Sequence, residues 1–165
     1  MRSGAHNEWT IAIEGPNHPH ALQLIQHLST ELASRYGDDG SGAFAPEDVQ
    51  GPRAAFVVAR ANGRPVGCGA LKPFDGIEPG TVAEIKRMFV EPDMRGRGIA
   101  RQILQKLEQV AVDLGYNTLR LETGDKQPEA MSLYERSGFR RIACYGRYAA
   151  QPWSVCYEKR MGPQT

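Results

Sequence analysis

The spacing of apolar residues along the chain predicts strands that alternate with helices. In some segments apolar side chains recur every three or four positions, which is the spacing of a helix that buries one face. These predicted helices are residues 20–36, 98–114 and 128–137. In other segments apolar and polar residues alternate, or β-branched and aliphatic residues follow one another without interruption. Both patterns favour strands. The predicted strands are residues 9–13, 54–59, 66–71, 82–90, 117–122, 142–148 and 155–161.

Glycine and proline mark where these elements end. Asn62-Gly63 is the residue pair most typical of a two-residue turn in a hairpin. A glycine that can close the last helical turn follows each predicted helix: Gly37, Gly115 and Gly138. Residues 37–53 and 73–80 are rich in glycine and proline and predict loops, the first with a short helix from Pro46.

The order of the elements predicts a mixed α/β (α+β) sheet. A strand, a helix and a second strand of the lengths seen in residues 82–122 imply a parallel pair, whereas the strands 54–59, 66–71 and 82–90 follow one another through turns and are expected to be antiparallel. We therefore expect a mostly antiparallel sheet with a central parallel strand pair, flanked by about four helices. At 165 residues the chain is expected to form one domain, residues 1–165.

Composition excludes several classes of protein. Lys and Arg number 20 and Asp and Glu 19, and the resulting net charge of +1 argues against a nucleic-acid binder. The longest aliphatic stretch, residues 54–59, is too short to span a membrane, and the N-terminus lacks the apolar region of a signal peptide. The three cysteines are too few for a secreted disulfide framework, and we expect small core residues rather than nucleophiles. A cytoplasmic location follows from these features.

Although the net charge is close to zero, charged residues are unevenly distributed along the chain. Residues 37–50 carry only acidic charges: Asp38, Asp39, Glu47 and Asp48. Residues 86–101 carry mainly basic ones: Lys86, Arg87, Arg95, Arg97 and Arg101. This pattern suggests that the protein holds two partners of different charge.

The glycine-rich segment 90–100 joins a predicted strand to a predicted helix. Free amides and a partial positive charge at a helix N-terminus suit a pyrophosphate, although a solvated basic turn has the same composition. A Walker loop would need Gly-Lys-Ser/Thr, which is absent. A dinucleotide fingerprint fails because the sixth position from Gly96 is Arg101 rather than Gly or Ala.

This segment resembles the acetyl-CoA pyrophosphate motif of the GNAT superfamily of N-acetyltransferases. The motif is Arg95-x-x-Gly98-x-Ala100, preceded by Met88-Phe-Val90. The resemblance continues through Leu121-Glu122 and Gln127 to residues 130–139, so that it covers residues 82–139. It implies the GNAT-type fold, acetyl-CoA as co-substrate and no metal.

The resemblance also implies roles for individual residues. The amides of residues 88–90 would hold the pantetheine arm and polarise the thioester carbonyl, on a strand that splays from residues 119–122. The amides of residues 96–101 and the neighbouring arginines would hold the pyrophosphate, and Tyr134 would protonate the leaving thiolate, unless its ring only packs in the core. Gln127 stands where the family commonly has Asn. The expected cofactor-binding residues are Met88, Phe89, Val90, Arg95, Gly96, Arg97, Gly98, Ile99, Ala100, Arg101, Gln127 and Tyr134.

Attack on the thioester needs a neutral amine and therefore a base, because alkyl amines are almost fully charged at pH 7. Glu84 and Glu122 lie on apolar strands where burial would raise the pKa of a carboxyl. Alternation places Glu84, Lys86 and Met88 on one face of their strand, with Ile85, Arg87 and Phe89 on the other, so that Glu84 with Lys86 can also be a plain ion pair. Of the two, Glu84 is the favoured candidate.

The expected reaction is acetyl transfer to a primary amine of a small molecule by direct attack in a ternary complex. The acidic loop would favour a cationic acceptor, unless it is simply solvated. The alternatives are a non-catalytic acyl-CoA sensor, a protein or peptide N-acetyltransferase, and a nucleic-acid binder that uses the arginines near residue 95. The spacing of His18, His20 and His27 does not suggest a metal site. A homodimer is left open.

Overall fold

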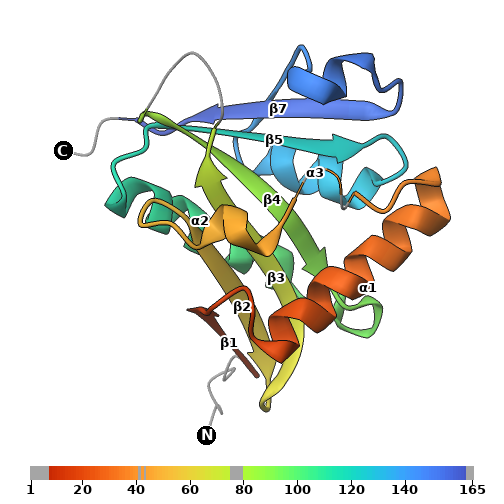
Figure 1. Cartoon of the computed structure of the whole chain (residues 1–165), viewed down its shortest axis with the longest axis vertical. Coiled ribbons are helices and arrows are strands. Elements are labelled where there is room, and N and C mark those ends of the chain that lie inside the picture. The colour runs from red at the N-terminus through yellow and green to blue at the C-terminus, as the bar shows by residue number, and fades with distance from the viewer. Residues whose placement is uncertain (1–7, 41, 43, 75–79, 163–165) are drawn as a thin grey trace, which may run out of the picture.

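The computed structural model describes residues 8–40, 42, 44–74 and 80–162. These residues form a seven-stranded sheet with helices on both faces (Figure 1). The strands are β1 (Trp9–Ile13), β2 (Ala55–Ala61), β3 (Arg64–Pro73), β4 (Val82–Val90), β5 (Thr118–Gly124), β6 (Arg140–Ile142) and β7 (Ser154–Arg160). The helices are α1 (Pro19–Tyr36), α2 (Ile99–Asp113) and α3 (Pro128–Arg136), with the short 3-10 helices η2 (Pro46–Val49), η3 (Pro92–Met94) and η4 (Gly146–Ala150).

The sheet has the predicted mixed topology. Its strand order is β1-β2-β3-β4-β5-β7-β6, and every neighbouring pair is antiparallel except β4 with β5. The described residues contain three α-helices and short 3-10 helices rather than about four helices. The hairpin at Asn62-Gly63 is confirmed, since both residues have the positive φ that its turn requires.

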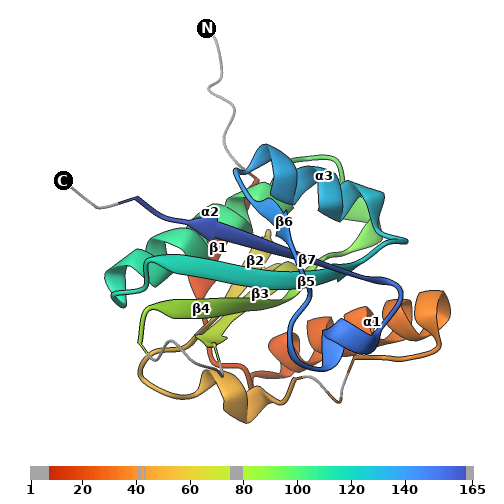
Figure 2. The same ribbon diagram turned by 90° about the horizontal axis from the view of Figure 1, so that it is seen from above.

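The helices divide the core into two layers. Figure 2 shows α1 on one face of the sheet and α2 with α3 on the other. On the α1 face, Leu24 packs with Phe56 and Phe89, and on the opposite face Ile103 and Leu107 pack with Leu119. Among the described residues, no helix is both long and apolar enough to cross a membrane.

The parallel strands β4 and β5 pair only along their first halves. Their register runs from Val82 opposite Thr118 to Ile85 opposite Leu121, and beyond this point the strands diverge (Figure 1). The backbone groups of β4 that point away from β3 beyond Ile85 therefore have no strand partner. The predicted splay of the two strands is present.

A β-bulge in β4 corrects the predicted side-chain alternation. Cys68 of β3 lies opposite Phe89 and Ala70 opposite Lys86, so two residues of β4 face only Gly69. Arg87, in the bulge, has a φ of +56°. The extra residue moves Arg87 to the α1 face, where it contacts Ser29, while Met88 packs into the core on the α2 face. The predicted grouping of Glu84 and Lys86 with Met88, and of Arg87 with Ile85, was wrong for this reason.

The predicted strand over residues 142–148 was also wrong. Strand β6 ends at Ile142, and η4 begins at Gly146, whose φ is +54°. A disulfide between Cys144 and Cys156 fixes the segment that leaves β6 against β7. The expectation of small core cysteines therefore holds for the buried Cys68 but not for this pair. The predicted turn at residues 73–80 lies mostly outside the described residues.

Candidate active site

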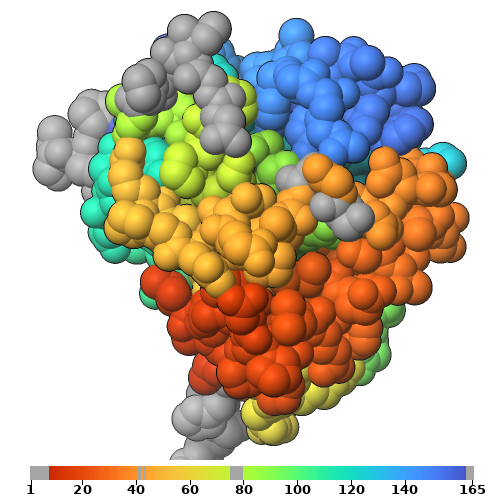
Figure 3. Space-filling model, viewed as in Figure 1, coloured from red at the N-terminus to blue at the C-terminus, as the bar shows by residue number. Residues whose placement is uncertain are grey.

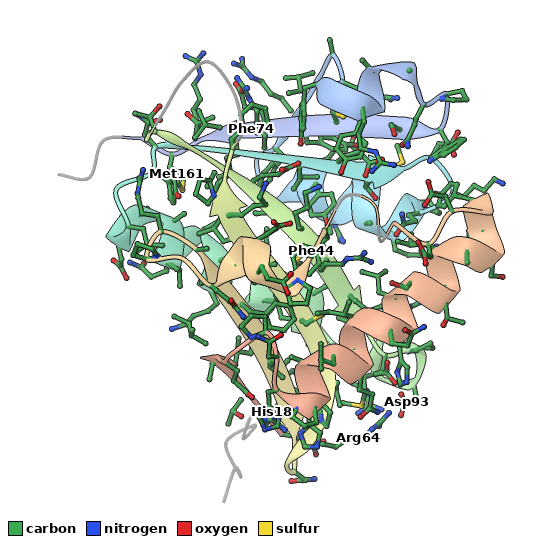
Figure 4. All side chains as sticks on the ribbon, in the orientation of Figure 1. His18, Phe44, Arg64, Phe74, Asp93 and Met161 are labelled. Atoms are coloured by element: carbon green, nitrogen blue, oxygen red, sulfur yellow. A yellow bond between two sulfur atoms is a disulfide. The ribbon has the colours of Figure 1, made fainter. Side chains whose placement is uncertain are left out.

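A cleft opens on the α1 face where β4 and β5 diverge. It is bordered by α1, by the loop after α1 and by the start of α3. Phe44, from that loop, lies over this face of the sheet (Figure 4). The space-filling view shows the end of α1 (orange) beside the segment after β6 (blue), as expected from the stacking of Tyr36 on Trp153 (Figure 3). The polar and charged residues that line the cleft are Glu84, Lys86, Arg87, Glu122, Thr123, Gln127 and Tyr134.

The N-terminus of α2 has the form of an anion cradle. Gly96 and Gly98 both have positive φ (79° and 87°), and open space surrounds the position that a Cβ would take on either residue. The first helical amides, at residues 98–101, donate no hydrogen bond to any described acceptor, and the first α2 amide that does so is that of Gln102. Free amides beside open space fit a pyrophosphate, which supports the residues expected to bind it.

The three arginines expected at this cradle have different surroundings. Arg95 is held by the protein: its Nε donates to the carbonyl of Val90 at 2.9 Å, and its Nη2 donates to the carboxylate of Glu31 at 2.8 Å. Arg97 and Arg101 are exposed on either side of the first turn of α2. The guanidinium of Arg95 therefore joins β4 to α1, and the exposed pair is the better placed to meet phosphate charge.

Substitution of Gly98 by alanine is expected to weaken the binding of CoA about tenfold. Alanine at this φ costs about 1–2 kcal/mol, and relaxing that strain turns the helical amides away from the cradle. Isothermal titration of CoA measures the change. The control is Gly115→Ala at the other end of α2, where φ is +89°. It should lower the free energy of unfolding similarly and leave CoA binding unchanged, and equal loss of CoA affinity in both variants would contradict the assignment.

Glu84, on β4, is the centre of a charge network. Its carboxylate lies 3.5 Å from Nζ of Lys86 and 4.0 Å from Nζ of Lys72, and it accepts a hydrogen bond of 3.3 Å from the hydroxyl of Tyr145. Lys86 in turn donates to the hydroxyl of Tyr148 at 2.6 Å, and burial lowers the pKa of this lysine. The carboxylate of Glu84 is thus engaged by two ammonium groups and a hydroxyl within the protein.

Glu122, on β5, has a different environment. Burial raises the pKa of its carboxyl to about 6, against the opposing effect of a 2.7 Å hydrogen bond from the hydroxyl of Ser154. Ser154 is in place because β7 pairs with β5, with Ser154 opposite Gly124. A carboxylate with a pKa near 6 is ionised at neutral pH and is a stronger base than an exposed one. The geometry thus favours Glu122 over Glu84, the reverse of the preference drawn from the sequence.

Tyr134, on α3, lies between the core and the cleft. Its ring packs against Phe139 and Tyr157 in the core, and the residue also lines the cleft. Burial, with a further contribution from the nearby charge of Glu122, raises the pKa of the phenol above its usual value. The hydroxyl therefore keeps its proton at neutral pH and can donate a hydrogen bond. The ring packs in the core as one interpretation expected, and the role of the hydroxyl toward the leaving thiolate stays a prediction.

Gln127 is the residue immediately before α3. It lines the main cleft and an adjoining cleft that extends toward η4 and Trp153. The described side-chain hydrogen bonds include none from Gln127 to the amides of α3. Its position at the wall that both clefts share is consistent with the expected contact to the cofactor.

The acidic loop after α1 is engaged within the protein. A carboxylate oxygen of Asp38 accepts from the amide of Gly40 at 2.9 Å, and Asp38 lies 3.9 Å from Arg147. Asp48 accepts from the amide of Ala45 at 2.9 Å. Two of the four carboxylates that suggested a cationic acceptor, Asp38 and Asp48, therefore have partners within the protein.

The structure adds residues that the sequence did not single out as functional. Arg147, in η4, lines the adjoining cleft, and Arg87, in the β-bulge, lines the main one. Ser154, on β7, reaches Glu122 through its hydrogen bond. The predicted strand over residues 155–161 made a pairing with β5 foreseeable. No local sequence pattern indicates a bulge at an arginine. Among the described residues, no three His, Cys, Asp or Glu side chains gather as metal ligands would.

A splayed parallel pair, an amide cradle at a helix start and a half-buried carboxylate near a tyrosine together fit an acyl-CoA-dependent acyltransferase. The model of the acetyltransferase (GNAT) family matches residues 21–139. A protein of Azospirillum brasilense named IAA acetyltransferase is 36% identical over 151 residues, which cover 91% of this chain and 96% of the relative. The chain belongs to the GNAT acetyltransferase family.

Solved structures agree with this assignment. A protein of Klebsiella pneumoniae assigned to the acyl-CoA N-acyltransferases has a TM-score of 0.76 and 28% identity, over 93% of this chain and 98% of that one. A GNAT family acetyltransferase of Elizabethkingia anophelis, solved with acetyl-CoA bound, has a TM-score of 0.68 and 20% identity, over 94% of this chain and 100% of that one. The predicted family, fold and enzyme class are confirmed, and the neighbour from Elizabethkingia anophelis holds the predicted donor, acetyl-CoA.

Proposed function

We propose that the protein transfers the acetyl group of acetyl-CoA to a primary amine of a small molecule, by direct attack in a ternary complex. The observation that carries the proposal is the placement of Glu122 and Tyr134 on one cleft, where β4 and β5 diverge. A base and a hydrogen-bond donor are what direct transfer to an amine requires. Acetyl-CoA, when bound, supplies a thioester whose carbonyl carbon accepts the amine nitrogen.

Each residue would have a separate role in the transfer reaction. Glu122 takes a proton from the ammonium group of the acceptor, directly or through water, so that the nitrogen can form the C–N bond. The unpaired backbone amides of β4 near Met88 donate to the thioester oxygen while it carries negative charge. As the C–S bond breaks, the hydroxyl of Tyr134 donates a hydrogen bond to the thiolate, and the second proton of the acceptor nitrogen passes to solvent. The raised pKa of this phenol favours a shared hydrogen bond over complete proton transfer to sulfur.

The small-molecule acceptor is supported by the relative from Azospirillum brasilense, whose name refers to IAA. The cleft, bordered by α1, the loop after it and α3, also suits a small molecule better than an extended peptide. A cationic acceptor and a cytoplasmic location stay predictions.

The test incubates acetyl-CoA with a panel of amines and monitors the release of free thiol. The panel contains amino acids, polyamines, aminoglycosides and peptides, and a thermal shift with CoA first establishes cofactor binding. We expect thiol release with small amines and an acetylated product by mass spectrometry. Stabilisation by CoA without turnover of any amine would instead indicate an acyl-CoA sensor, and turnover of peptides alone would indicate a peptide N-acetyltransferase.

A further inference from the structure

Arg87 is a buried arginine whose guanidinium has few hydrogen-bond partners and no ion pair among the described residues. It is 8% exposed, lines the cleft, and lies with its guanidinium 5.4 Å from the ring centre of Phe44. Its side chain makes a single long hydrogen bond, 3.4 Å to the hydroxyl of Ser29. No carboxylate of the described residues forms an ion pair with it, and Asp39 acts on it only as a more distant charge.

This arrangement is unfavourable for the protein alone. A guanidinium has five N–H donors, and a buried donor without an acceptor costs free energy. Burial accordingly lowers the pKa of Arg87. The residue also has a positive φ, a backbone conformation that is unfavourable for a non-glycine residue and that often occurs at functional sites. Two separate costs at one residue on the cleft point to a ligand that offsets them.

The surroundings define the chemistry of this ligand. A second guanidinium, that of Arg147 in η4, lines the adjoining cleft, which shares Leu32, Gly40, Glu122 and Gln127 with the main one. Apolar side chains from α1 and the loop, Leu28, Leu32 and Phe44, border the same space. Arginine pairs with a carboxylate through two parallel hydrogen bonds. The cleft thus combines an anion-binding group, an apolar wall and the base Glu122.

We propose that Arg87 binds a carboxylate of the acceptor, and that the amine acetylated at this site is that of an amino acid with an apolar side chain. This inference rests on the function proposed above and specifies its substrate class. The carboxylate lies at Arg87, with Arg147 adding positive charge at the mouth of the cleft, and the amine faces Glu122. It gives the acceptor the opposite charge from the one that the acidic loop suggested.

The test compares molecules that differ only in the carboxylate. Leucine is compared with leucinamide and with 3-methylbutylamine, and spermidine represents a cationic acceptor. An α-amino group beside an amide has a pKa near 8, so leucinamide has more free base at pH 7.5 than leucine has and would react faster without recognition. We expect kcat/KM to be about 10- to 100-fold higher for leucine, the range of one charge-assisted pair. The same comparison of amino acid, amide and decarboxylated amine is made for methionine and phenylalanine. It tests which side chains the apolar wall of the cleft accepts.

Arg87→Gln is expected to bring kcat/KM for leucine down to the value for leucinamide, with the KM for acetyl-CoA unchanged. Arg87→Lys keeps the charge without the two-pronged geometry and should recover part of the preference. The matched control is Arg141→Gln, which removes an exposed arginine on β6 and should change neither value. If Arg87→Gln does not fold, the substrate trio on the unmodified protein decides alone.

Binding provides a readout that does not depend on turnover. Leucine should raise the melting temperature of the CoA-saturated protein, and Arg87→Gln should abolish this shift. If leucine binds in this way but no amine is acetylated, the proposed function fails and the carboxylate site stands. If amines are acetylated but leucinamide or spermidine is preferred to every amino acid tested, the carboxylate site is overturned while the proposed function stands.

Discussion

Glu122→Gln is expected to make the protein more stable and nearly inactive. Loss of a general base lowers kcat/KM by about 10²- to 10⁴-fold. The folded-state pKa of Glu122, about 6, lies above the ordinary value of 4.5, so the folded protein holds this proton more tightly than the unfolded chain does. Stability therefore falls as pH rises from 4.5 to 6, and the ionised carboxylate costs about 2 kcal/mol above that range. Glutamine stays neutral and its amide oxygen can still accept from Ser154.

The matched variant Glu84→Gln should have the opposite effect on stability. Glu84 is 6% exposed, and its removal takes from Lys86 and Lys72 a carboxylate that lies 3.5 Å and 4.0 Å from their ammonium groups. Breaking a buried ion pair on one side costs about 3–5 kcal/mol. Activity measured well below the melting temperature should persist, because Glu122 remains.

Denaturant unfolding at pH 5 and pH 8 and the pH dependence of kcat/KM separate the two carboxylates. Unmodified protein should lose activity as pH falls through about 6, because Glu122 becomes protonated. Glu122→Gln should lack this acidic limb and most of the pH dependence of stability in the same range. Retention of both the rate and the acidic limb in Glu122→Gln would assign the base to another group.

The sequence was informative where a pattern is local. The apolar stripe and following glycine placed α2, and the strand–helix–strand order implied the parallel pair that the structure shows. The glycines at the start of α2 indicated the cradle, because only a few residue types tolerate their backbone conformation. These features depend on residues within one segment and its neighbours.

The choice between the two carboxylates depends on residues that are distant in the sequence. Alternation correctly placed Lys86 beside Glu84, but Lys72 approaches only because β3 sets it opposite Glu84. Glu122 is distinguished by the hydrogen bond from Ser154 of β7 and by a carboxyl pKa raised to about 6, and neither is visible on its own strand. The pKa of a carboxyl is set by all the elements that pack around it.

The segment after β6 was mispredicted because tertiary contacts override its β propensity. Its isoleucine and tyrosines are typical of strands, yet Tyr145 and Tyr148 turn toward Glu84 and Lys86 on β4. The disulfide then fixes Cys144 to β7. Without knowledge of those partners, local composition favours a strand.

Removal of the Cys144–Cys156 disulfide is expected to lower stability and to weaken acceptor binding selectively. The bond joins residues 12 apart, and closing a loop of this length in the unfolded chain is worth about 3 kcal/mol in the chain-entropy description. The closed segment carries Tyr145, Arg147 and Tyr148 to the acceptor side of the cleft. Reduction, or Cys144→Ala with Cys156→Ala, should therefore lower the melting temperature and raise the KM for the acceptor. The KM for acetyl-CoA should change little, because its cradle is built by α2.

Cys68→Ala is the control for this experiment, because its thiol is buried and burial raises its pKa to about 12, which leaves it unreactive. Thiol labelling of the unfolded chain should detect one thiol without reductant and all three with it. Three thiols in both samples of protein purified without reductant would show that the bond does not form. That result would agree with the predicted cytoplasmic location, whereas one thiol would favour a compartment that maintains disulfides, since they are rare in reducing surroundings. If the bond forms but its loss raises both KM values equally, the segment after β6 serves overall stability rather than the acceptor.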